Sequence, residues 1–419
     1  MATAVRLQFV VVFWAFSALG LAATRFVPLG AFPGGATSSG VAISADGKVV
    51  VGLATGSIAG KVRSMPFYWT ESSGMRQLDG PVLDGRSPYE LGAPLGVSGD
   101  GTVVFGRFVS GSDDSVFYKW TVGKGVTTIF GPGPLIPFDV THDGSRFGAV
   151  ASDDRYAAIA ISADGSYVVG SEYAAAGYRE AYRDHVGNGG APTRQWLGRL
   201  PGNEWNWTLA RELSPSGQIV VGWGLSDEVD ETGQYGVLIK PVLWTAVNGL
   251  AALPGVYQGS AHGVSATGQV VFGEGSNQGG PPVLYRWTPG GSLQALQSLL
   301  ASAGVDPAID GWEIQTVAAM SAHGRYFVGN AIHSTGRREA YLIELDIPGD
   351  FDGNGPVDGR DLLKWQRDGA DAGQFAQWTG NYWSPLTPLA PAATNGVPEP
   401  AAALLTLAAL AWPSMARRR

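Results

Sequence analysis

The chain has 419 residues, only 15% of them charged, and a formal net charge of −8 without a basic stripe, which argues against nucleic acid as a partner. Cysteine is absent, and this excludes disulfides, thiol nucleophiles and thiolate-bound metals. The 61 glycines in a weakly charged chain favour a turn-rich all-β protein over a helical or disordered one.

Residues 1–23 have the pattern of a secretory signal peptide. Arg6 precedes an apolar stretch (7–21), and the small residues Ala22 and Ala23 offer a cleavage site. The stretch is short for a membrane span, and an uncleaved anchor is the alternative. We therefore expect an exported protein of the cell envelope or the extracellular space.

A short motif recurs through residues 24–346. Its best copy, VAISADGKVVVG at 41–52, has a strand-like piece ending in Ser, a turn with Gly, and an apolar run closed by Gly. This pattern predicts a tight hairpin in which the turn Asp caps its own loop. The good copies are marked by Ser44, Ser98, Ser162, Ser214, Ser265 and Ser321. A weaker copy lies at 139–150. A spacing of about 50 residues with four strands per unit is typical of a propeller blade.

Each full unit has two further strands after this hairpin. The third strand ends in Trp-Thr in four units, and we expect the ring to pack between neighbouring blades: Trp69, Trp120, Trp244 and Trp287. Fourth strands are expected at 26–29, 75–79, 126–130, 194–199, 249–253 and 292–296. Residues 137–157 hold a strand pair alone. We predict a β-propeller of six four-stranded blades with a half-unit insertion, and seven blades is the alternative.

The two ends of the repeat region complement each other. Residues 25–30 resemble a fourth strand without partners before it, whereas the last unit (317–345) has three strands and no clear fourth. We predict that the first strand completes the last blade and closes the ring, because closure removes open sheet edges. Leucines at helical spacing in 293–304 predict a short helix docked on the propeller.

The unit S-A-D-G-x-x-V-V-G, followed by an aromatic strand ending in W-T and by L-P-G turns as at 200–202 and 253–255, resembles the bacterial extracellular HAF-repeat family. The resemblance covers 25–346. It implies secretion and a propeller-like fold, and it brings no catalytic residues.

Residues 347–384 have a different character, with the spacing of a calcium loop before a helix-like segment. The expected oxygen ligands are Asp350, Asp352, Asn354, the Pro356 carbonyl, Asp358 and Asp361. Gly355 takes the sharp-turn position. The segment resembles the loop and helix of dockerin-type modules, but a second loop is missing, so we expect one Ca²⁺. An acidic surface turn is the alternative.

Residues 385–396 are rich in Pro and Ala and form a linker. VPEP, an apolar run (401–412) and terminal arginines follow in order within 397–419. This order resembles the PEP-CTERM sorting signal. The resemblance implies recognition by an exosortase-type enzyme of Val397, Pro398, Glu399 and Pro400. The apolar run is short for a permanent membrane helix, so we expect a transient span, with a retained tail anchor as the alternative.

The sequence supplies no catalytic motif. The five histidines form no zinc-binding pair, and no nucleophile elbow or P-loop is present. A propeller mouth can nevertheless hold carboxylates for glycosidic cleavage, and the candidates lie in loops: Asp113, Asp114, Asp153, Asp154, Asp227, Glu228, Asp230 and Glu231.

We therefore expect an exported, non-enzymatic propeller that binds polysaccharide or another surface protein. One alternative is a carbohydrate-active enzyme, either a glycoside hydrolase or a lyase. The other is an adhesion or scaffold subunit that docks partners through 347–384.

Overall fold

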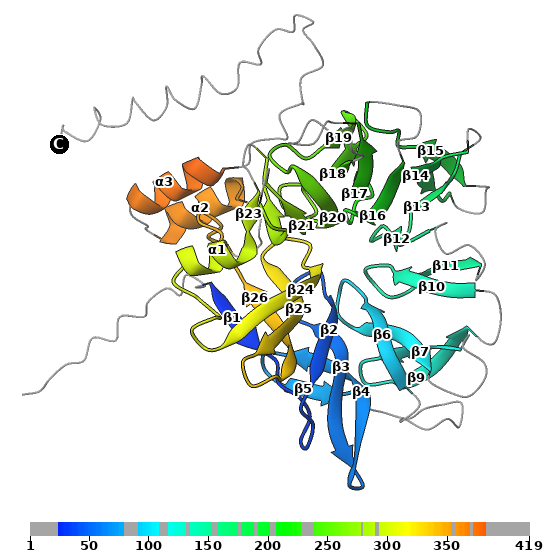
Figure 1. Ribbon diagram of the computed structural model, residues 1–419, viewed down its shortest axis with the longest axis vertical. Coiled ribbons are helices and arrows are strands. Elements are labelled where there is room, and N and C mark those ends of the chain that lie inside the picture. Colours follow the sequence, from blue (N-terminus) through cyan, green and yellow to red (C-terminus); the bar gives the residue numbers. More distant parts are fainter. Residues whose placement is uncertain are drawn as a thin grey trace, which may run out of the picture. The chain divides into compact units, whose positions relative to one another are not determined.

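The structure is a computed structural model that describes residues 24–78, 91–108, 116–130, 135–151, 158–174, 177–187, 192–201, 207–227, 238–277, 280–289, 293–352, 357–368 and 372–382. Strands dominate these residues and follow one another sheet by sheet along the chain (Figure 1). The signal peptide, the linker and the sorting motif at Val397–Pro400 lie outside the described residues, so their predictions stay untested.

The described strands form antiparallel sheets, and six of these sheets have four strands. The first contains β2 (Ser38–Ile43), β3 (Val50–Ile58), β4 (Lys61–Thr70) and β5 (Gly74–Gln77). The second contains β6 (Leu91–Val97), β7 (Val103–Phe108), β8 (Phe117–Thr121) and β9 (Gly125–Phe130). A two-stranded sheet follows, with β10 (Leu135–Val140) and β11 (Phe147–Ala151).

The remaining sheets continue the same order. One contains β12 (Ala160–Ile161), β13 (Tyr167–Tyr173), β14 (Arg179–His185) and β15 (Thr193–Trp196). The next contains β16 (Thr208–Leu213), β17 (Ile219–Ser226), β18 (Leu238–Thr245) and β19 (Gly249–Ala252). Another contains β20 (Gln258–Val264), β21 (Val271–Ser276), β22 (Val283–Trp287) and β23 (Gln294–Ala295). The last contains β24 (Trp312–Met320), β25 (Tyr326–His333), β26 (Arg338–Glu344) and β1 (Arg25–Pro28).

The first strands of these sheets form a closed circle. In order, β2 contacts β6, β6 contacts β10, and the series continues through β12, β16, β20 and β24 back to β2. Sheets that radiate from such a circle make a β-propeller. The two-stranded sheet occupies a place of its own in the circle, between the sheets of β6 and β12, where the sequence predicts a half-unit insertion.

The N-terminal strand closes the circle as predicted. β1 pairs antiparallel with β26, with Phe26 opposite Ile343 and Val27 opposite Leu342. The ring centroids of Phe26 and Tyr341 lie 5.3 Å apart. The last sheet therefore contains residues from both ends of the repeat region, and β1 covers the edge that β26 would otherwise expose.

The repeated turn is held by its buried Ser and its Asp. The hydroxyl of Ser98 donates to Asp100 Oδ1 at 2.6 Å and accepts from the Val103 N–H at 3.0 Å. Gly101 has φ 73°, and a Cβ there would lie 2.7 Å from Val49 of the neighbouring sheet. The prediction that the turn Asp caps its own loop is confirmed.

Backbone hydrogen bonds join the turns of neighbouring sheets to one another. The donor and acceptor pairs are Ala45 to Gly99, Asp100 to His142, His142 to Ala163, Ala163 to Pro215, Ala266 to Ala322 and Ala322 to Ala45. Pro215 interrupts the series because proline has no N–H to donate. These bonds tie the circle together at one end of its first strands.

The recurrent tryptophans are packing residues, as predicted. Trp120 shares a core cluster with Val49 and Val51 of the preceding sheet. Trp69, Trp244 and Trp287 are likewise buried in clusters that span two sheets. The predicted helix is α1 (Leu296–Ser302), which buries Leu296 and Leu300 against the last sheets.

Two further helices follow the propeller, α2 (Gly359–Asp368) and α3 (Ala372–Asn381). Trp365 and Phe375 pack between them, with ring centroids 5.0 Å apart. Among the described residues, no helix has the length and hydrophobicity to cross a membrane.

Candidate functional site

A cavity of about 330 Å³ lies where the first strands of all seven sheets converge. Its lining comes from the ends of these strands and from the turns that follow. Small and aliphatic side chains, such as Ala42, Val97 and Val264, make up most of the wall. The lining has few polar side chains, so each of these stands out: Asp139, His142, Glu212 and His262.

β-Bulges shape this wall. In six of the first strands the register shifts shortly before the turn, between Gly40/Ala42, Pro94/Gly96, Pro137/Asp139, Ala210/Glu212, Ala261/Gly263 and Val317/Ala319. A bulge bends the strand and redirects its side chains. The residue just after each bulge lines the cavity.

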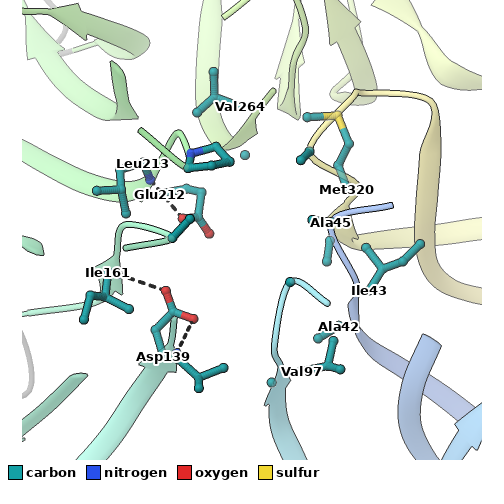
Figure 2. A pocket seen from close by; sticks show the side chains of 18 of the residues that line it. Ala42, Ile43, Ala45, Val97, Asp139, Ile161, Glu212, Leu213, Val264 and Met320 are labelled. Carbon is teal, nitrogen blue, oxygen red and sulfur yellow. Dashed lines mark hydrogen bonds between the residues drawn. The ribbon is translucent and has the colours of Figure 1, made fainter. Parts of the chain in front are cut away.

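At this position two sheets carry acids, namely Asp139 on β10 and Glu212 on β16. Asp139 accepts the Val140 N–H at 2.7 Å and the Ile161 N–H at 2.9 Å. Glu212 accepts the Leu213 N–H at 2.9 Å. Backbone donors thus fix both carboxyl groups within the cavity (Figure 2).

The two acids lie on one side of the cavity, whereas Ile43, Ala45 and Met320 line the opposite side (Figure 2). Burial raises the pKa of Asp139, despite the opposing hydrogen bonds from Ile161 and Val140. Burial also raises the pKa of Glu212, and the nearby negative charge of Asp139 raises it further. A cationic group or a strong donor entering the cavity would relieve this penalty.

Two histidines also line the cavity, His142 in a turn and His262 at the bulge of β20. Burial lowers the pKa of His262, and the positive charge of Arg211 lowers it further, so the neutral imidazole is favoured. A neutral imidazole can donate and accept hydrogen bonds, which adds a second polar point to the wall.

Sequence reasoning missed Asp139 and Glu212. The loop acids proposed instead, Asp113, Asp114, Asp153, Asp154, Glu228, Asp230 and Glu231, lie outside the described residues. Asp227 follows β17 at its end and is not part of the cavity lining. The missed signal was a departure from the repeat: two residues before the turn Ser, or before Thr141 in the weaker copy, the other units have only Ala or Gly.

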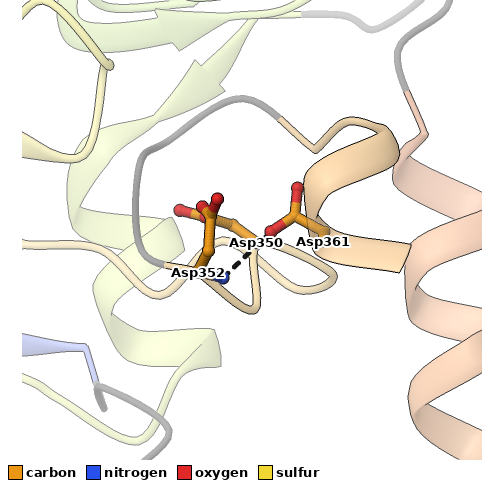
Figure 3. A group of neighbouring side chains, drawn as sticks. All are labelled: Asp350, Asp352 and Asp361. Carbon is orange, nitrogen blue, oxygen red and sulfur yellow. Dashed lines mark hydrogen bonds between the residues drawn. The ribbon is translucent and has the colours of Figure 1, made fainter. Parts of the chain in front are cut away.

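The predicted calcium loop forms a second acidic cluster. Single carboxylate oxygens of Asp350, Asp352 and Asp361 all lie within 4.8 Å of one another (Figure 3). Asp361 is buried and accepts the Asp352 N–H at 3.0 Å and the Asp358 N–H at 2.7 Å. Arg325 of the last sheet lies 3.7 Å from Asp350.

Of the other predicted ligands, the structure describes Asp358. The side chain of Asp358 accepts the Arg360 N–H at 2.7 Å at the start of α2, so it caps the helix and is not part of the cluster. Asn354 and Pro356 lie outside the described residues. Three acidic oxygens at this spacing fit a hard cation, which prefers oxygen ligands.

Comparison with known proteins gives structural neighbours only. No family model and no curated protein matches the chain. Among solved structures, the chain is similar to TolB from Acinetobacter baumannii, with 12% identity, a TM-score of 0.36, and 71% of this chain and 80% of that one covered.

Two archaeal structures are also similar. For the β-propeller domain of the Trilobed protease from Pyrococcus furiosus the identity is 9% and the TM-score 0.45, with 74% and 94% of the two chains covered. For the acylaminoacyl peptidase from Pyrococcus horikoshii the identity is 10% and the TM-score 0.45, with 76% of this chain and 53% of that one covered. At this level of similarity, none of these proteins informs the activity of this chain.

Proposed function

We propose that the protein is an exported β-propeller of the cell envelope that binds an extracellular ligand in its central cavity without turning it over. The observation that supports this most is the uneven lining of the cavity, with Asp139 and Glu212 on one side and aliphatic groups on the other. Polysaccharides combine apolar sugar faces with hydroxyl donors. A lysine of a surface protein combines an aliphatic stem with a cation.

Binding fits this geometry better than glycosidic cleavage. A glycosidase places its two carboxyl groups on either side of the scissile bond and keeps one protonated and the other ionised. Here both carboxyl groups extend from the same side of the cavity, which does not match that arrangement. The pair is therefore suited to accept hydrogen bonds or a positive charge.

A carbohydrate-active enzyme is the second candidate. It is favoured by the fact that two carboxyl groups whose charges interact share one cavity. Paired acids of this kind are typical of functional sites.

A polysaccharide array with a parallel assay for reducing ends separates the two candidates. We expect wild-type protein to bind without releasing reducing ends, and the double variant Asp139→Asn/Glu212→Gln to lose binding. Release by wild-type protein but not by the double variant would establish the enzyme instead. Binding that the double variant retains in full would remove the cavity from the proposal.

We also propose that the loop at 350–361 holds one Ca²⁺ and that an exosortase-type enzyme processes the chain at Val397–Pro400. Calcium binding is supported by the convergence of Asp350, Asp352 and Asp361. A docking role for this module is a further candidate, because the large apolar side chains Leu363 and Phe375 are exposed on its helices.

A further inference from the structure

A second hollow, of about 520 Å³, lies at the seam where the ring closes. It is lined from one side by β2, β3 and β4 of the first sheet and from the other by β24, β25 and β26 of the last sheet. It involves the early part of β2, from Ser38, and the middle of β24, whereas the central cavity lies at the ends of the same two strands. The two sites are therefore distinct.

The lining of this seam groove is rich in hydroxyl and amide groups. Asn330 on β25 links the two sides of the groove. Its Oδ1 accepts the N–H of Gly40 on β2 at 3.0 Å, and its Nδ2 donates to Thr316 Oγ1 on β24 at 3.0 Å. Ser39 and Ser64 from the first sheet and Gln315 from the last sheet add further exposed groups. The groove thus offers donors and acceptors from both sides of the seam.

Arg338 is the only charged side chain among the residues that line the groove. It is exposed at the start of β26. The nearby acid Glu339 is buried and lies 3.5 Å from Arg337, so an ion pair on the same hairpin offsets its charge. A guanidinium group beside hydroxyls and amides suits an anionic group carried on a hydroxyl-rich chain, because it binds carboxylate or sulfate with two parallel hydrogen bonds.

We propose that the seam groove binds an anionic polysaccharide, with Arg338 pairing with its acidic group and with the hydroxyls and amides of both sheets bonding the sugar hydroxyls. The chain carries a net charge of −8, which repels anionic polymers in general. Binding therefore depends on the local charge of Arg338. Because the ligand contacts the first and last sheets together, its binding also stabilises the closed ring.

The test is calorimetric titration of the full-length protein with oligogalacturonate in calcium-free buffer, which leaves the loop at 350–361 out of the measurement. Methyl-esterified oligogalacturonate is the neutral arm of the experiment, because its carboxyl groups carry no charge. A sulfated oligosaccharide is a second acidic arm, which shows whether the groove prefers sulfate or carboxylate groups. We expect wild-type protein to bind an acidic arm, to bind the neutral arm at least about tenfold more weakly, and to melt at a higher temperature when the acidic ligand is present.

Arg338→Gln is the decisive variant and Lys124→Gln its control, because both remove one exposed positive charge and Lys124 lies outside the groove lining. We expect about a tenfold loss of affinity for Arg338→Gln and little change for Lys124→Gln. Equal losses in both variants, or no binding of either acidic arm by wild-type protein, would overturn the proposal. The cavity variant Asp139→Asn/Glu212→Gln should bind the acidic arm normally, so failure here and failure of the cavity proposal are distinguishable.

Discussion

The carboxylate of Glu344 accepts a hydrogen bond of 2.5 Å from Nε of Arg25, although 319 positions separate the two residues in the sequence. Glu344 also accepts from Arg325 Nη2 at 3.0 Å and from the Tyr326 hydroxyl at 2.9 Å. One buried carboxylate therefore joins the N-terminal strand to two neighbouring strands of the last sheet. Ring closure depends on this polar contact as well as on the backbone pairing of β1.

Replacing Glu344 with Gln should destabilise the propeller by about 3 kcal/mol, because it leaves the buried Arg325 guanidinium without its closest anion. Urea unfolding of wild type and variant measures this difference. Glu71→Gln is the control, since Glu71 pairs with the same Arg25 but is exposed, and it should cost about 0.5 kcal/mol or less. Similar losses of stability in both variants would mean that the buried contact of Glu344 does not stabilise the closed ring.

The turn serines offer a second stability test. Ser162 is fully buried, donates to Asp164 at 2.7 Å and accepts the Tyr167 N–H at 2.9 Å. Ser162→Ala should lower the free energy of unfolding by about 1–3 kcal/mol, because it leaves a buried donor unsatisfied. The control is Ser166→Ala, which removes an exposed hydrogen bond to the same Asp164 and should have a much smaller effect. Equal stability of Ser162→Ala and wild type would count against this role of the repeat serine.

The acids of the central cavity predict a pH dependence of stability. Because burial raises the pKa of Asp139 and Glu212, the folded state holds protons that the unfolded state has already released. Stability should therefore fall as pH rises above about 4, where unfolded carboxyl groups ionise, and should level off above the raised pKa values.

The double variant Asp139→Asn/Glu212→Gln should remove most of this decline and melt at a higher temperature than wild type at pH 8. Melting curves between pH 4 and pH 8, in buffer without ligand, provide the measurement. Asp310→Asn, which changes an exposed acid, should follow the wild-type curve. If the double variant declines with pH as steeply as wild type, the two acids are not the cause.

Much of the fold could be predicted from local patterns. The hairpin turns, the buried tryptophans and the closure by residues 25–28 each follow from a periodic signal or from an unpaired strand. Whether the two-stranded sheet takes a place of its own in the circle could not be read in this way, because it depends on contacts of β10 with β6 and β12. Strand content alone does not reveal such contacts.

The candidate site was harder to predict for a related reason. Asp139 and Glu212 meet only because bulges in two separate strands direct them into the same cavity. In the sequence they are 73 positions apart, and each looks like an isolated acid in a strand. The side chain of Asp358 has a contact that loop spacing did not predict, since it caps the start of α2.

The calcium proposal predicts a specific set of binding losses. Calorimetry of the full-length protein should show uptake of one Ca²⁺, and Asp350→Asn should abolish it, because three acidic oxygens that converge without a cation repel one another. Asp368→Asn is the matched control, because this acid lies at the end of α2, outside the cluster, and pairs with Lys364. Absence of calcium uptake by wild type, or uptake that Asp350→Asn leaves unchanged, would rule out the site.

The last prediction concerns the C-terminus. The mature protein should lack the residues beyond Val397–Pro400 and should be found outside the cytoplasmic membrane, because the apolar run at 401–412 is shorter than the ~20 residues of a stable span. The terminal arginines should hold this run at the cytoplasmic face long enough for processing, and the Pro-rich linker should keep the motif extended and accessible. Mass spectrometry of the purified protein and of each cell fraction measures the outcome.

Replacing Arg417, Arg418 and Arg419 with Gln should leave more of the chain unprocessed, because it removes the charges that retain the C-terminus on the cytoplasmic side. Replacing Arg360, Lys364 and Arg367 on α2 with Gln removes the same number of charges elsewhere and is the control. It should leave processing unchanged. A dominant wild-type species that ends at Arg419 and stays in the cytoplasmic membrane would instead identify the segment as a permanent tail anchor.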